Sequence, residues 1–91
     1  MKDVYDIKKQ QENLRKHGIS FDDIPLFDWN NAITKQDTRY EYGESRFISY
    51  GFINNRLHVL IWTLRENNIR PISFRKANQR ERRQYEKDKS R

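Results

Sequence analysis

The 91-residue sequence contains no cysteine, only two prolines and only three glycines. Without cysteine the chain has no disulfide framework, no thiolate zinc site and no cysteine nucleophile. Its longest apolar run, residues 59–62, is far too short to span a bilayer, and its first residues have no apolar stretch of signal-peptide length. We therefore expect a single cytoplasmic domain, residues 1–91, with no membrane contact.

Apolar residues are scarce, at 34%, whereas charged residues reach 35%. A chain of this length buries a thin core, and the aromatic residues, 13% of the sequence, supply much of the area available for burial. That aromatic content and the low proline content also argue against disorder.

The positive charge is concentrated near the C-terminus. The formal net charge is +6, and residues 75–91 hold eight basic and three acidic side chains, a net +5. A basic segment of this kind suits a polyanion, most often nucleic acid. A solvated terminal helix accounts for the same charge equally well.

Two short helices are predicted near the N-terminus. The first begins at Asp6, a good N-cap, and ends at Gly18, a good residue to follow a helix. The second follows Ser20, because apolar side chains recur at helical spacing over residues 21–27.

Alternating apolar residues then predict an antiparallel sheet of three to four strands. Residues 57–65 are apolar on both faces, which predicts a central strand, and Asn54-Asn55 suits the hairpin turn before it. Pro71 cannot donate to a ladder, so its strand should be an edge or contain a bulge. The expected strands are residues 32–35, 46–53, 57–65 and 69–75.

A basic helix should close the chain. Asn78 and Glu81 form a capping box for a helix that runs to about Lys89. Only Ala77 and Tyr85 are candidates to anchor it, so we expect its attachment to be weak. The fold class is thus α+β: two N-terminal helices, an antiparallel sheet and a basic C-terminal helix.

Four arginines lie along the expected strands or at their ends and are candidates to cradle a phosphate: Arg46, Arg65, Arg70 and Arg75. The guanidinium group matches phosphate oxygens and stays charged, although ordinary solvated arginines would show the same spacing. The two histidines, His17 and His58, are 41 residues apart, and no spacing typical of a metal site is present. We expect no metal and no cofactor.

The sequence leaves the proton donor and acceptor open. His58 is better interpreted as a structural residue of the central strand, and His17 as a cap at the end of the first helix. The remaining candidates are Lys76, Tyr85, Glu44 and Glu66. The aromatic residues that could stack on bases are Trp29, Tyr40, Tyr42 and Tyr50.

Three motifs in order resemble one known family: residues 13–21 (Asn-Leu-Arg-Lys-His-Gly-Ile-Ser-Phe), residues 70–77 (Arg-Pro-Ile-Ser-Phe-Arg-Lys-Ala) and residues 80–82 (Arg-Glu-Arg), with Tyr85-Glu86 beyond. They resemble the BrnT-type toxins, members of the RelE-like ribonuclease toxins of bacterial type II toxin–antitoxin systems. The resemblance covers about residues 5–86. The chain departs from the family at Leu64, where many members carry an acidic residue, and at Pro71, where an aliphatic residue is usual.

The resemblance implies a RelE-like toxin that cleaves RNA, inhibits translation and is neutralised by a BrnA-type antitoxin, with which it would form a hetero-oligomer. Together with the charge pattern it suggests two sets of site residues. The catalytic set is Arg65, Arg70, Arg75, Lys76 and Tyr85, and the RNA-binding set is Arg46, Arg80, Arg83 and Lys87. Without a metal, cleavage should leave a 2′,3′-cyclic phosphate. The alternative is a non-catalytic module that uses its basic C-terminal helix to bind nucleic acid or a protein partner.

Overall fold

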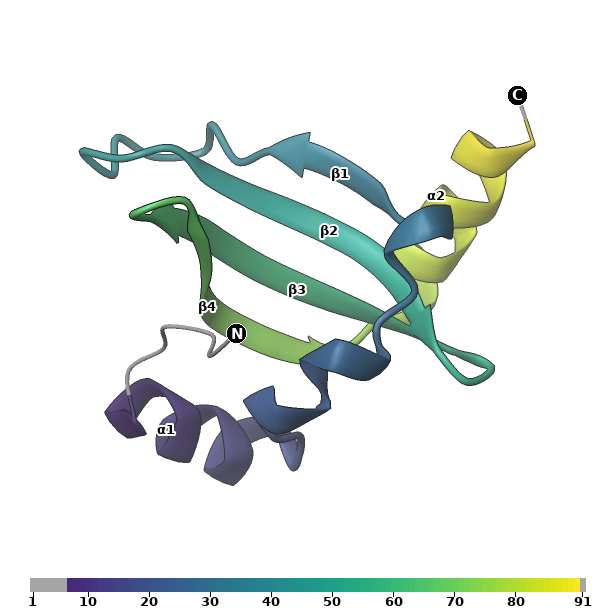
Figure 1. Cartoon of the computed structure of the whole chain (residues 1–91). Helices are drawn as coiled ribbons and strands as arrows, with labels where there is room; N and C mark the ends of the chain where they lie inside the picture. The colour runs from purple at the N-terminus through teal and green to yellow at the C-terminus, as the bar shows by residue number, and fades with distance from the viewer. Residues whose placement is uncertain (1–6, 91) are drawn as a thin grey trace.

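Helical segments stand at both ends of a run of four strands in the computed structural model, which describes residues 7–90 (Figure 1). The elements are α1 (Ile7–His17), the 3₁₀ helices η1 (Phe21–Leu26) and η2 (Trp29–Asn31), β1 (Ile33–Gln36), β2 (Arg46–Ile53), β3 (Arg56–Arg65), β4 (Asn68–Lys76) and α2 (Gln79–Lys89). The expected α+β class is confirmed.

The strands form one antiparallel sheet in the order β1-β2-β3-β4. The turn between β2 and β3 is Asn54-Asn55, as predicted, and Asn54 adopts a φ of 55°. Asparagine tolerates this left-handed conformation better than most residues. β3 has a neighbour on each side, which agrees with the central position predicted from its two apolar faces.

Pro71 lies in an edge strand that also contains a bulge. Ile61 of β3 is opposite Ser73, whereas Trp62 is opposite Pro71, so Ile72 is an extra residue in β4. Proline has no N–H to give to a ladder and is tolerated at edges and bulges. Either feature was expected from Pro71, and the structure has both.

Each face of the sheet has its own apolar core. The first core joins η1 and the residues around it to the sheet and contains Ile19, Phe21, Ile24, Phe27, Leu60 and Phe74. The second lies on the opposite face, beside α2, and contains Leu57, Val59, Ala77 and Tyr85. The two cores explain why β3 is apolar on both sides.

The N-terminal helices agree with the sequence prediction in part. α1 ends at His17 and Gly18 follows with a φ of 69°, but the predicted N-cap Asp6 lies outside the described residues. The second helix is a 3₁₀ helix, capped by the Ser20 hydroxyl, which accepts the Asp22 N–H at 3.0 Å. No helix within residues 7–90 is long and apolar enough to cross a membrane.

Asn13 attaches α1 to the free edge of β4, beside which α1 lies (Figure 1). It is the buried residue of α1, with 5% of its surface exposed. Its Nδ2 donates to the carbonyl oxygens of Phe74 (2.8 Å) and Ile19 (3.0 Å), and its Oδ1 accepts the Phe74 N–H (2.8 Å). The amide therefore takes the place of a further strand beside Phe74, and α1 docks through hydrogen bonds.

Changing Asn13 to Ala should lower the free energy of unfolding by about 2–4 kcal/mol, because three backbone groups lose their partner at once. Urea denaturation measures this loss. Gln11→Ala, at an exposed position of the same helix, is the matched control and should change stability by less than about 0.5 kcal/mol. Equal stability of the two variants would contradict the role of Asn13.

Candidate nucleic-acid interface

Arginines from three strands lie on one face of the sheet. Alternation along β3 places Arg65 on the same face as Thr63. Arg46 of β2 and Arg70 of β4 are both paired with Thr63, so they lie on either side of it. Strands are about 4.8 Å apart, which puts the Cα atoms of Arg46 and Arg70 at about 10 Å from each other.

Arg75 shares this face but lies further along β4, opposite Val59. Thr63 lies four positions after Val59 in β3, a distance of about 14 Å along the strand. The structure therefore divides the four arginines into a group of three near one end of the sheet and Arg75 near the other. They follow the face of the sheet as a track rather than meeting at one point.

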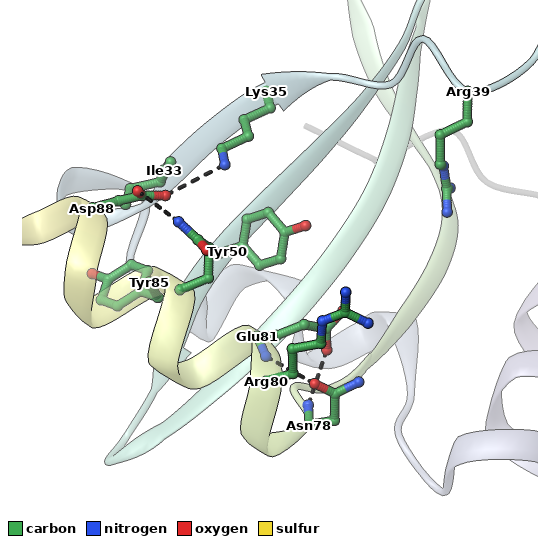
Figure 2. Close-up of a pocket in the computed structure, with 10 residues that line it drawn as sticks. Ile33, Lys35, Arg39, Tyr50, Asn78, Arg80, Glu81, Tyr85 and Asp88 are labelled. Atoms are coloured by element: carbon green, nitrogen blue, oxygen red, sulfur yellow. Dashed lines mark hydrogen bonds and ion pairs between the residues drawn. The ribbon is translucent and has the colours of Figure 1, made fainter.

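A cleft of about 490 Å³ lies between α2 and the Arg75 end of this face (Figure 2). Tyr50 projects into it from β2, and its hydroxyl points away from α2 (Figure 2). The charged side chains that line the cleft are Lys35, Arg39, Arg80, Glu81 and Asp88. Three positive and two negative side chains therefore surround an aromatic side chain, and both carboxylates are paired with cations, Glu81 with Arg75 and Asp88 with Lys35. An aromatic ring among cations is an arrangement suited to a nucleotide.

Few side chains attach α2 to the sheet. Tyr85 is its buried residue; the ring lies edge-on against Phe52, and the hydroxyl donates to the Asn31 carbonyl oxygen at 2.7 Å. Lys35 of β1 pairs with Asp88 at 3.3 Å. The predicted capping box of Asn78 and Glu81 is present, so the helix begins where expected.

Arg75 and Glu81 form a two-point ion pair at the base of α2. The terminal nitrogens Nη1 and Nη2 of Arg75 donate to the two carboxylate oxygens of Glu81 at 2.8 and 2.7 Å. These bonds lower the pKa of Glu81 and raise the pKa of Arg75. The Arg75 Nε and the outer N–H of Nη2 are not used by Glu81, so one fork of the guanidinium is still available to an anion.

Arg46 stands over an aromatic ring. Its guanidinium carbon is 4.1 Å from the centre of the Tyr42 ring, a cation–π contact, and its Nε is 3.3 Å from Glu44. The loop between β1 and β2 therefore holds this arginine in place.

Two of the proposed catalytic residues lie apart from the arginine track. Lys76 is paired with His58, and alternation assigns both to the opposite face of the sheet. The Tyr85 side chain is buried and its hydroxyl is engaged, and burial raises its pKa. The geometry thus supports the arginines more strongly than Lys76 or Tyr85.

The histidines are placed as structural residues. His58 is buried, its ring lies against Phe74, and its Nδ1 is 2.9 Å from the Arg56 carbonyl oxygen. Burial lowers its pKa. His17 ends α1 as expected. Within residues 7–90 no three His, Asp or Glu side chains are grouped so that they could hold a metal ion.

Three basic side chains of α2 share one side of the helix. Arg80, Arg83 and Lys87 are separated by three and four residues, which places them along one stripe. Arg80 reaches the cleft, whereas Arg83 lies at the outer surface beside Arg82. The stripe would extend a basic surface from the cleft outward.

Lys35 and Arg39 line the cleft but were not among the residues selected from the sequence. The alternation of β1 contains a signal for Lys35, because it lies on the same face as Ile33. Arg39 belongs to the loop between β1 and β2, which is polar throughout, and no local sequence pattern distinguishes it as a binding residue. Its position depends on how that loop folds back over the sheet.

Comparison with known families identifies one match. A family described as "Ribonuclease toxin, BrnT, of type II toxin-antitoxin system" matches residues 5–81. No curated protein matches the chain. The matched range contains α1, the whole sheet and the first turn of α2, and therefore the arginine track and Glu81.

Replacing Tyr85 by Phe tests whether its hydroxyl is structural. Losing the bond to Asn31 should lower the free energy of unfolding by about 1 kcal/mol, while RNA cleavage stays within about twofold of the unchanged chain. Urea denaturation and a cleavage assay on the same preparation measure both. A loss of 100-fold or more in rate, the size expected for an acid–base residue, would instead support a catalytic Tyr85.

Proposed function

The chain belongs to the BrnT family of ribonuclease toxins of type II toxin–antitoxin systems, and from this premise we propose that it is a metal-independent endoribonuclease that inhibits translation in the cytoplasm. The observation that carries the proposal is the arginine track, which spans three strands of the sheet and whose Arg75 pairs with Glu81 in the lining of the cleft beside α2. Membership of the family implies an antitoxin partner, which we propose to be of the BrnA type.

Arginine side chains suit the chemistry of metal-free RNA cleavage. The 2′-oxygen attacks the adjacent phosphorus, the bond to the 5′-oxygen breaks, and a 2′,3′-cyclic phosphate results. Negative charge accumulates on the phosphorane oxygens, and fixed guanidinium groups stabilise it. Arg65, Arg70 and Arg75 are the proposed phosphate-stabilising residues. The sequence-based candidates for proton transfer, Lys76 and Tyr85, lie apart from this track.

The remaining basic residues are proposed to bind the RNA on either side of the scissile phosphate. Arg46 lies beside Arg70 across Thr63 and continues the track. Arg80, Arg83 and Lys87 carry it onto α2. A single strand that follows this surface would pass the aromatic side chain of Tyr50, on which a base can stack.

Changing Arg75 to Ala should slow RNA cleavage by at least about 100-fold and abolish growth arrest, because a fixed donor to the phosphorane is removed. Arg65→Ala and Arg70→Ala should act in the same direction. Cleavage of a labelled RNA by purified protein and growth after induction in bacteria measure the effects.

Arg15→Ala is the matched control, since it removes the same charge from an exposed position of α1. Arg75→Ala also breaks the ion pair with Glu81, so circular dichroism must show that the variant is folded. Full toxicity of folded Arg75→Ala would overturn the proposed site. RNA binding without cleavage by the unchanged chain would favour a non-catalytic RNA-binding module.

Cleavage should persist in excess EDTA and leave 2′,3′-cyclic phosphate ends. The described residues offer arginines to stabilise the transition state and no grouped metal ligands. Product ends can be identified by mass spectrometry of a cleaved oligonucleotide. Strict dependence on added magnesium, or 3′-hydroxyl ends, would contradict this mechanism.

A further inference from the structure

A buried carboxylate lies at the base of the loop between β1 and β2. The side chain of Asp37 is 1% exposed, and its partners come from within the loop. Its Oδ1 accepts from the Nε (2.8 Å) and the backbone N–H (3.2 Å) of Arg39, and its Oδ2 accepts from Arg39 Nη2 (2.9 Å) and the Tyr42 hydroxyl (2.9 Å). The backbone N–H of Asp37 donates to the Arg46 carbonyl oxygen at 2.7 Å, which joins this cluster to β2.

The other partner of this ion pair, Arg39, faces the cleft. Its side chain is 60% exposed and lines the cleft, on the side away from α2 (Figure 2). Asp37 occupies two of the five guanidinium N–H groups, those of Nε and Nη2 along one edge. Of the three N–H groups that Asp37 does not use, one on Nη1 and one on Nη2 form a second fork that matches two oxygens of a phosphate.

Asp37 stays ionised at every pH at which the protein is expected to work. The hydrogen bonds from Arg39, the largest influence, hold the pKa of the carboxyl well below its usual range. The Arg39 side chain is not the sole donor to this carboxylate, because the Tyr42 hydroxyl and the Arg39 backbone N–H also donate hydrogen bonds to it. It lies at the Nε–Nη2 edge of the guanidinium, which leaves the adjoining Nη1–Nη2 edge directed elsewhere.

An arginine held in this way has already lost the rotamer freedom that a free surface arginine would lose on binding. The same Asp37 cluster supports Tyr42, whose ring carries the guanidinium of Arg46. The loop therefore orients two arginines toward the proposed RNA face: Arg46, which was selected from the sequence, and Arg39, which was not.

We propose that Arg39 is a phosphate-binding residue for single-stranded RNA at the rim of the cleft opposite α2, and that Asp37 is the positioning residue that holds it there. The inference rests on the proposed function, since it assigns an RNA phosphate to the same cleft. The loop between β1 and β2, through Arg39, and the helix α2, through Arg80, then form the two rims between which the strand passes.

Changing Arg39 to Ala should weaken RNA binding about tenfold, the order expected for one charge-assisted contact. It should also reduce the magnitude of the slope of log affinity against log salt by about 0.7, the value for one phosphate contact with a single strand. The probe is a short fluorescent single-stranded RNA that is 2′-O-methylated throughout, so that it binds without being cleaved. Fluorescence anisotropy at several salt concentrations measures affinity and slope.

Two further variants control for charge and for loop structure. Arg15→Ala removes a positive charge from exposed α1 and should leave the slope unchanged. Arg39→Gln still donates a hydrogen bond to Asp37 but has no charge, so it keeps the loop attached and should show the same reduced slope as Arg39→Ala. If Arg39 served only to fasten the loop, Arg39→Ala would lower the melting temperature while the salt slope stayed unchanged, and the proposal would be wrong.

A double-mutant cycle tests Asp37. Asp37→Asn alone should weaken binding several-fold, and adding it to Arg39→Ala should cause no further loss, because its effect passes through Arg39. Independent, multiplying losses would overturn the positioning role.

The RNA-binding measurement distinguishes the proposed function from the role of Arg39. If the unchanged chain does not bind the RNA probe at all, both the proposed function and the proposed role of Arg39 are wrong. If the unchanged chain binds and the Arg39 variants bind equally well with equal slopes, only the role of Arg39 is overturned.

Discussion

The ion pair between Arg75 and Glu81 is the contact on which the cleft depends. Glu81 accepts the Asn78 N–H that closes the capping box and binds both terminal nitrogens of Arg75. One carboxylate thus begins α2, attaches it to β4 and orients an arginine of the proposed RNA face. Since Tyr85 is the buried residue of α2, the position of the helix over the sheet depends on this polar contact together with Tyr85 and the ion pair of Lys35 with Asp88.

Ion pairs between a carboxylate and a cation recur around the arginine-bearing face. Asp37 holds Arg39, Glu44 contacts Arg46 and Asp88 contacts Lys35, each within 3.3 Å. Cations gathered on one surface repel one another, and interleaved carboxylates reduce that repulsion while restricting the side chains. A polyanion then meets donors that are already oriented, which lowers the entropy lost on binding.

Most of the fold follows from local signals. The alternation of residues 46–53 matches β2 at both ends, and the capping residues place the start of α2 correctly. Pro71 predicted an edge or a bulge, and the structure has both. The errors lie where the signal is weak. The first strand is shifted by one residue relative to residues 32–35, and the second helix is 3₁₀ because its six residues include Pro25 and allow little room for an α-helix.

The sequence by itself determined the α+β class, the four strands, the basic C-terminal helix and the family, because periodicity, caps and motifs are local properties of the chain. It also identified the candidate arginines, since their positions along the expected strands can be read directly from the sequence. Only the tertiary structure decided which arginines share a surface, that Asn13 docks α1, and that Arg39 reaches the cleft. Those facts depend on strand register and on contacts between residues up to 61 positions apart, and no local pattern encodes them.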